Sequence, residues 1–365
     1  MSRRGRALDA LAQGLAGHPV GLPDWSLVFS IANDHLLTPA LWTTLVESGA
    51  TSTLPPDAAD YLATLHRLNG DRNRALRRQA VEMIAALNVR GITPALLKGG
   101  LTLLEGPYAD PAQRMMRDLD ILVPPGARDD AIGVLERLGY RLCRSYGLEH
   151  HAFGDFARPN DPGSVDLHTE LVDPSHILPA SEVWARAAIM ERDGVRYAAP
   201  DATDRVLHNL LHAQIHHLGN FYRGDLQVQQ AYELTMLARH HGSSVDWPFI
   251  QWRMHAHRLG AALDSHLLAA HRLFGLGWPL SRPPGSAGRL HYARCRLQFE
   301  VRAMRWIAIP LANLRGAFAW HRMHALYGQA DGLRDGVLRW RARHLLQYLA
   351  KKGPRATFSR LLRVD

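Results

Sequence analysis

The chain has 365 residues, of which 47% are hydrophobic, and it carries a formal net charge of +9. That length can bury a large core and suggests two or three structural units, which excludes a disordered or fibrous protein. The only cysteines, Cys143 and Cys295, are too few for a disulfide framework, and no stretch reaches the roughly 18 apolar residues of a membrane-spanning helix. We therefore expect a cytoplasmic globular protein without a transmembrane segment or signal peptide.

The first predicted region, residues 1–90, is helical. After Pro55 and Pro56, apolar residues recur at spacings close to three and four, as they do on one face of a helix. Gly70 lies inside this run and predicts a break in it, because glycine disfavours a helix interior. We expect several helices that lead into the following residues and pack against them.

Residues 91–200, the second predicted region, contain short apolar runs separated by turn residues. The predicted strands are 93–97, 118–123, 140–145, 150–157 and 164–170. The predicted helices are a short one at 99–104 and an amphipathic one with its apolar stripe at 132–138. Together these elements predict an α+β core with a mixed sheet, in which 159–163 is a hairpin turn.

Residues 201–365, the third predicted region, return to helical periodicity, with an apolar stripe at 206–218 and further helices at 247–274 and 331–349. From residue 301 onward the chain holds 13 Arg or Lys and three acidic residues, whereas the rest is close to neutral. Such a basic terminus attracts RNA, acidic lipid or polyphosphate, but a solvated helical face explains it equally well. Nucleic acid is not the favoured partner, because no RNA-binding module is recognisable.

Two predicted strands carry acidic residues in an alternating pattern. Asp118 and Asp120 share one face of their strand, because alternate side chains point the same way. Asp166 and His168 share a face of a later strand in the same manner. Three such carboxylates suit Mg²⁺, and two ions about 4 Å apart can clamp both oxygens of a phosphoryl transfer. For the first pair alone, an exposed Asp-x-Asp at a strand end is the alternative.

A lysine and two glycines precede these strands. Lys98 is the only lysine in the first 350 residues, and Gly99 and Gly100 follow it directly. A glycine pair can bring backbone N–H groups against a triphosphate, because no Cβ blocks the approach. Lys98 offers a compact charge for phosphate, with a structural ion pair as the alternative. Arg114 and Arg117 could neutralise charge on the transferred phosphorus, although Arg117 points to the other face in an ideal strand.

His208, His212 and His216 recur every four residues and share one helix face. A metal site is one interpretation, but no acidic or cysteine ligands accompany these histidines. The other is a stripe that faces the nucleotide cleft, so that His212 and His216, together with His168, are candidate contacts to a second substrate. Exposed positions are expected for the pairs His150-His151 and His240-His241.

The motifs follow one another as Lys98-Gly99-Gly100, Tyr108, Arg114, Asp118-Leu119-Asp120, Leu138-Gly139-Tyr140 and Val165-Asp166-Leu167-His168. This succession resembles the bacterial uncharacterised nucleotidyltransferase family of the polymerase-β-like superfamily, over about residues 80 to 280. The resemblance implies a nucleotidyltransferase core flanked by helical regions.

In an enzyme of this kind, Asp118, Asp120 and Asp166 would hold Mg²⁺, with two ions expected and Mn²⁺ as a substitute. The glycine pair would bind the NTP phosphates, and Lys98 and Arg114 stand at family motif positions. The resemblance implies attack on the α-phosphate of an NTP such as ATP, with release of pyrophosphate.

The acceptor is expected to be a hydroxyl or phosphate of a small molecule or peptide, because helical regions commonly supply the acceptor wall. A tRNA- or protein-directed nucleotidyltransferase is the alternative that the basic terminus raises. An alternative of another class is a non-catalytic nucleotide-binding protein that retains the fold. Loss of an aspartate would have indicated that class, and all three are present.

Overall fold

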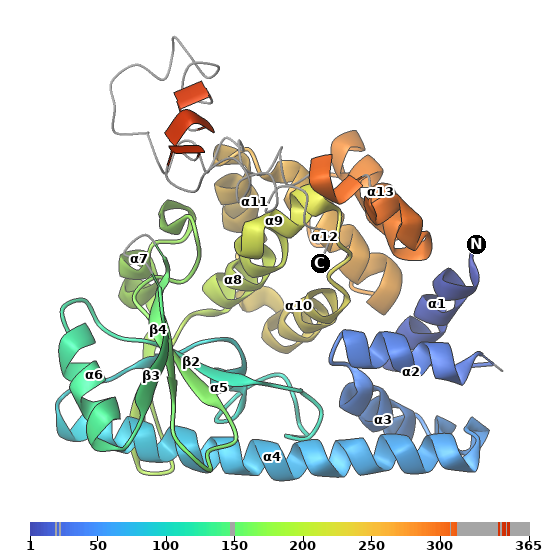
Figure 1. The fold of residues 1–365 in the computed structure, drawn as a ribbon. Coiled ribbons are helices and arrows are strands. Elements are labelled where there is room, and N and C mark those ends of the chain that lie inside the picture. The colour runs from blue at the N-terminus through green and yellow to red at the C-terminus, as the bar shows by residue number, and fades with distance from the viewer. Residues whose placement is uncertain are drawn as a thin grey trace.

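The computed structural model describes residues 1–18, 20–21, 23–146, 150–306, 308–311, 342–343, 345–347 and 349–350. It contains a seven-stranded sheet, on one side of the molecule, with the strand order β3-β4-β5-β2-β1-β7-β6 (Figure 1). The strands are β1 (Ala95–Leu96), β2 (Asp118–Leu122), β3 (Arg141–Ser145), β4 (Ala152–Ala157), β5 (Ser164–His168), β6 (Ala188–Arg192) and β7 (Val195–Ala199). The sheet is mixed, with the pairs β2–β5 and β1–β7 parallel and the other four pairs antiparallel, and helices pack against it, which confirms the predicted α+β class.

The parallel pair of β2 and β5 positions the acidic residues. In its register, Asp120 lies opposite Asp166, so both side chains face the same side of the sheet. Leu119 and Ile121 alternate with the aspartates and are fully buried on the opposite face. β1 pairs with β2 from the other side, and its chain continues directly into the short helix α5 (Lys98–Thr102).

Helices α4 (Pro56–Val89) and α6 (Arg128–Arg137) cover the face of the sheet that lacks the aspartates (Figure 1). The predicted break at Gly70 is wrong, because α4 runs through it without interruption. A Cβ on Gly70 would lie 3.1 Å from the Cβ of Ala112. Glycine at this position therefore allows the chain before β2 to pack closely against α4, at the cost of some helix propensity.

Most of the other described helices form two groups. The N-terminal group comprises α1 (Arg3–Leu15), α2 (Trp25–Asp34) and α3 (Thr38–Glu47). The C-terminal group comprises α8 (Ala202–Gln214), α9 (His216–Arg223), α10 (Val228–His241), α11 (Trp247–Ala256), α12 (Gly260–Phe274) and α13 (Ser286–Glu300). Both groups contribute to one buried apolar cluster, and the Arg296 guanidinium joins them through an ion pair 2.8 Å from Asp9.

Several elements differ from the prediction. Helix α7 (Ala180–Arg186) and the hairpin of β6 and β7 were not predicted. The single helix predicted at 247–274 is two helices, because Arg258 between α11 and α12 adopts a φ of 59°. The stripe predicted at 206–218 is divided between α8 and α9.

The predicted helix at 331–349 lies mostly outside the described residues, and the basic residues 351–365 lie entirely outside them. Within the part of the chain that is described, no helix combines the length and hydropathy needed to cross a membrane.

Candidate active site

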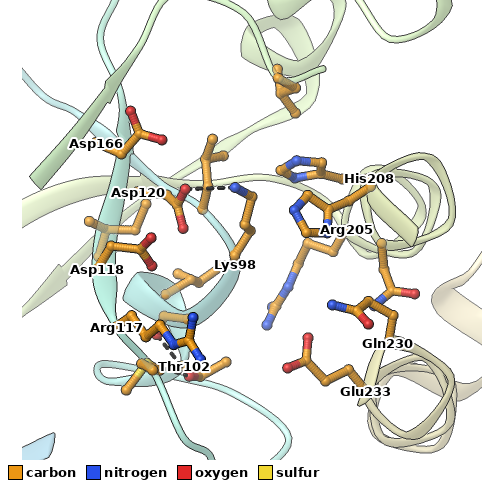
Figure 2. Close-up of a pocket in the computed structure, with 18 of the residues that line it drawn as sticks. Lys98, Thr102, Arg117, Asp118, Asp120, Asp166, Arg205, His208, Gln230 and Glu233 are labelled. Atoms are coloured by element: carbon orange, nitrogen blue, oxygen red, sulfur yellow. Dashed lines mark hydrogen bonds and ion pairs between the residues drawn. The ribbon is translucent and has the colours of Figure 1, made fainter. Parts of the chain in front are cut away.

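A cavity of about 640 Å³ lies between the aspartate face of the sheet and helices α8 and α10. Figure 2 shows the aspartates on one wall and Arg205, His208, Gln230 and Glu233 on the other. Lys98 extends between the two walls (Figure 2). The cavity is therefore lined by charged and polar groups from segments that are far apart in the sequence.

The structure brings Asp118, Asp120 and Asp166 to the same wall of this cavity (Figure 2). Asp118 is exposed toward the cavity, Asp166 is half-buried, and Asp120 is only 4% exposed. Because β2 and β5 are neighbours in the sheet, their backbone hydrogen bonds fix the positions from which all three carboxylates extend.

Asp120 is held by two cationic groups. Lys98 Nζ lies 2.6 Å from Asp120 Oδ1, and His168 Nε2 lies 3.0 Å from the same oxygen. Burial would raise the pKa of Asp120, but Lys98 and His168 together hold it well below the usual value. Burial opposes the charge on Lys98 as well, yet Asp120 raises the Lys98 pKa above its ordinary value. Lys98 therefore forms an ion pair, which was the alternative to phosphate binding in the sequence analysis. This ion pair, with Asp120, lies within the cavity and not on the outer surface.

His168 lies behind the aspartates with 0% exposure. Its Nε2 is also 3.1 Å from Asp166 Oδ2, so one imidazole bridges the carboxylates of β2 and β5. Burial lowers the pKa of His168, but the hydrogen bonds to Asp120 and Asp166 outweigh burial and raise it to about 9. This position favours holding the aspartates over touching a second substrate.

The carboxylates fit a divalent cation. Burial and repulsion from Asp120 raise the pKa of Asp118, so added positive charge here would favour its ionised form. Asp166 Oδ1 is buried and has no hydrogen-bond partner among the described residues. Oxygen donors with unsatisfied negative charge are the ligands that Mg²⁺ prefers.

Gly99 and Gly100 pack against β2 and the segment that precedes it. A Cβ on Gly99 would collide with Arg114 Nη1 and with the sulfur of Met116. A Cβ on Gly100 would meet the backbone oxygen of Asp120 at 3.4 Å. Close packing within the cavity wall thus explains this pair of glycines, whether or not a phosphate binds there.

The two predicted arginines lie differently. Arg114 Nη2 forms an ion pair 2.9 Å from Glu233 Oε1 of α10, and both side chains are largely buried. Burial opposes the charge on Arg114, but Glu233 raises its pKa. Arg117 is exposed at the cavity, with its backbone oxygen accepting a hydrogen bond from Arg72.

His208, His212 and His216 of α8 and α9 line the same cavity. His208 is 5% exposed, and its Nε2 has no hydrogen-bond partner among the described residues. Burial, and then the charge of Lys98, lower the pKa of His208 well below its usual value, so the ring is neutral. His212 and His216 continue the stripe with stacked rings, 5.1 Å between centroids.

Several cavity residues escaped the sequence analysis. His151 was expected to be exposed, but it is 3% exposed, and its ring lies 4.3 Å from that of His216. Arg205 and Glu233 reach the cavity only because α8 and α10 pack over the sheet. No local spacing could have revealed this, because the aspartates of the opposite wall are between 39 and 115 positions away from these two residues in the sequence.

A family model described as "Uncharacterised nucleotidyltransferase" matches residues 22–275, more than half of the chain. The chain belongs to this nucleotidyltransferase family. The match confirms the resemblance and begins earlier than the sequence motifs indicated, so helices α2 and α3 belong to the family region. No curated protein and no solved structure matches the chain. As a member of the nucleotidyltransferase family, the protein is a transferase enzyme that carries out nucleotidyl transfer.

Proposed function

We propose that the protein transfers a nucleoside monophosphate from an NTP, such as ATP, to a hydroxyl or phosphate of a small-molecule or peptide acceptor. The α-phosphorus gains a bond to the acceptor oxygen and loses its bond to pyrophosphate. The observation that carries the proposal is the wall of Asp118, Asp120 and Asp166, fixed by adjacent strands and facing a cavity of about 640 Å³.

The three aspartates would hold Mg²⁺, with Mn²⁺ as a substitute. When bound, one or two such ions would polarise the α-phosphate and neutralise charge on the leaving pyrophosphate. The chain's own residues prepare this wall, because Lys98 and His168 already balance the buried charge of Asp120. Asp166 would also accept the proton that the attacking hydroxyl loses.

The nucleotide is expected on the side of the cavity that α5 forms. Lys98 and Arg117 would offer positive charge to the triphosphate, and the backbone of Gly99 lies beside them in the cavity wall. The charge of Arg114 is already balanced by Glu233. This ion pair supports a role for Arg114 in holding the cavity wall in place as much as a role in binding phosphate.

The acceptor is expected against α8 and α10. His208 offers a buried, neutral ring nitrogen without a hydrogen-bond partner among the described residues. The amide oxygen of Asn209 is likewise buried and has no hydrogen-bond partner among these residues. His212 and Gln230 continue this wall. Neutral hydrogen-bonding groups suit a hydroxylated molecule or a peptide backbone better than a polyanion.

The experiment is incubation of the full chain with Mg²⁺, each α-labelled NTP and pools of acceptors. Labelled product should form with the unmodified protein and be lost in Asp118→Asn. Asp57→Asn, an exposed position at the start of α4, is the matched control and should keep full activity. Product formation that survives Asp118→Asn would contradict the proposal.

A further inference from the structure

Next to the aspartate wall, two histidines and one carboxylate are arranged like metal ligands. His151, Asp166 and His168 each place one ligand atom within 4.8 Å of the others. His168 Nε2 and Asp166 Oδ2 are 3.1 Å apart. Two ligands that are each about 2.1 Å from one ion have a separation of about 3 Å, so this pair is already spaced for shared coordination.

Both imidazoles are oriented from behind. His151 Nδ1 donates to Asp173 Oδ2 at 2.8 Å, and His168 Nδ1 donates to the backbone oxygen of Glu170 at 3.1 Å. A neutral histidine that donates from Nδ1 carries its lone pair on Nε2. Without an ion, His168 Nε2 donates to Asp120 and Asp166 as well, so an ion bound there would replace the proton on that nitrogen. Metal-binding histidines are typically fixed in this way by a carboxylate or a backbone carbonyl.

The two histidines of this group are buried and packed against other rings. His168 and His151 are 0% and 3% exposed, and their rings lie 5.0 Å apart. The ring of His216 packs edge-on against His151 at 4.3 Å. The remaining oxygen of Asp166 is buried and has no hydrogen-bond partner among the described residues. Unsatisfied buried oxygen beside two fixed imidazoles is more typical of a ligand set than of a structural hydrogen-bond network.

We propose that His151, Asp166 and His168 bind one transition-metal ion of the Mn²⁺, Co²⁺ or Zn²⁺ type, with Asp173 orienting His151. Imidazole nitrogens favour such ions, whereas Mg²⁺ favours an all-oxygen set. This site shares Asp166 with the aspartate wall. Any role of its ion in catalysis therefore rests on the proposed function. Asp120 Oδ1, 3.0 Å from His168 Nε2, connects the two sites.

A neighbouring grouping of His150, His151 and Asp173 offers a different ligand set within the same 4.8 Å limit. There Asp173 would bind the ion instead of orienting a ring. We favour the first grouping, because its two histidines are both buried and both donate from Nδ1. The His150 ring is half-buried, and its Nδ1 accepts a hydrogen bond from Ala152 N at 3.1 Å, which places the proton of a neutral ring on Nε2.

The test is titration of the metal-free full chain with Co²⁺, followed by calorimetry and by visible absorption, which reports nitrogen coordination. We expect one Co²⁺ ion to bind tightly per chain. His151→Phe keeps the ring packing but removes both nitrogens, so it should weaken that binding roughly 100-fold or more. Asp173→Asn should weaken it about 10-fold. His150→Gln is the matched control and should leave it unchanged.

Circular dichroism and thermal melting establish that each variant is folded. If His151→Phe does not fold, the Co²⁺ affinity of Asp173→Asn tests the site instead. The absence of tight Co²⁺ binding in the unmodified chain would overturn the proposal, as would loss of this binding in His150→Gln. Asp118→Asn should keep Co²⁺ binding while losing nucleotidyl transfer. If the chain binds Co²⁺ but consumes no NTP, this metal site stands and the proposed function is rejected. If the chain consumes NTP but binds no Co²⁺, the proposed function stands and this metal site is rejected.

Discussion

Arg114 and Glu233 form an ion pair across the candidate active site, with 2.9 Å between Nη2 and Oε1. The pair joins the segment before β2 to helix α10, so it ties the sheet wall of the cavity to the helical wall. The two side chains are only 13% and 16% exposed, which limits solvent screening.

Breaking this pair from one side should destabilise the fold. Arg114→Met leaves the Glu233 carboxylate largely buried without its partner, and we expect a loss of about 2–4 kcal/mol in the free energy of unfolding. The double variant Arg114→Met/Glu233→Gln should recover at least half of that loss, because no uncompensated charge remains. Urea unfolding of both single variants and the double variant measures the coupling. Additive losses would show that the pair does not link the walls.

Lys98 and Asp118 should contribute differently to the reaction. Lys98→Ala removes one charged hydrogen-bond donor, so the KM for the NTP should rise about 10- to 100-fold while measurable turnover remains. Asp118→Asn should lower kcat by roughly 1000-fold, because it removes a carboxylate proposed to hold the metal. Steady-state kinetics on the two variants separates the roles, and a larger loss in Lys98→Ala would reverse the assignment.

The two glycines of α5 should respond differently to an added methyl group. Gly99→Ala forces a Cβ against Arg114 and Met116 and should cost about 1–3 kcal/mol of stability. Gly100→Ala should cost less, because the nearest atom lies at 3.4 Å. Gly133→Ala in α6, whose nearest neighbour is the flexible end of Arg137, should instead stabilise the protein by about 0.5–1 kcal/mol. Thermal melting ranks the three variants, and an equal response at Gly99 and Gly133 would contradict the close packing of α5.

His266 should make the protein sensitive to mild acid. Burial lowers its pKa to about 4, and Gln214 Nε2 donates to its Nδ1 at 3.1 Å. The unfolded chain binds a proton near pH 6.5 that the folded chain excludes until about pH 4. The contribution of His266 to the free energy of unfolding is therefore fully present above pH 6.5. As the pH falls from 6.5 to 4, the free energy of unfolding decreases by about 3 kcal/mol.

His266→Asn keeps a neutral acceptor for Gln214 but does not titrate. Urea unfolding at pH 7, 5.5 and 4 should show a shallower decline for the variant than for the unmodified chain. Parallel declines would mean that His266 is protonated in the folded protein.

The sequence predicted β2, β5 and α6 well, because each has one apolar face and clear end signals. It failed for β6, whose residues are all exposed and therefore show no alternation. A signal for that hairpin was nevertheless present, since Asp193-Gly194 is a typical two-residue turn, and both residues adopt positive φ values of 54° and 75°.

The candidate site was predictable mainly on the sheet side; on the helical side, only the four-residue spacing of His208, His212 and His216 indicated residues that line the cavity. The spacing of Asp118, Asp120 and Asp166 within strands determines their shared face, and local alternation reveals it. The opposite wall depends on how α8 and α10 pack, which is a tertiary property. The burial of His151 likewise depends on contact with His216, a residue from another element.

The contact between α1 and α13 also affects how the chain can fold during synthesis. Ser2 N donates to Glu300 Oε2 at 3.1 Å, and Asp9 pairs with Arg296, so α1 completes its packing only with α13. The N-terminal helices therefore emerge from the ribosome long before the residues that bury them. During that interval their apolar faces depend on chaperones or on temporary contacts, which makes early truncation products prone to aggregate.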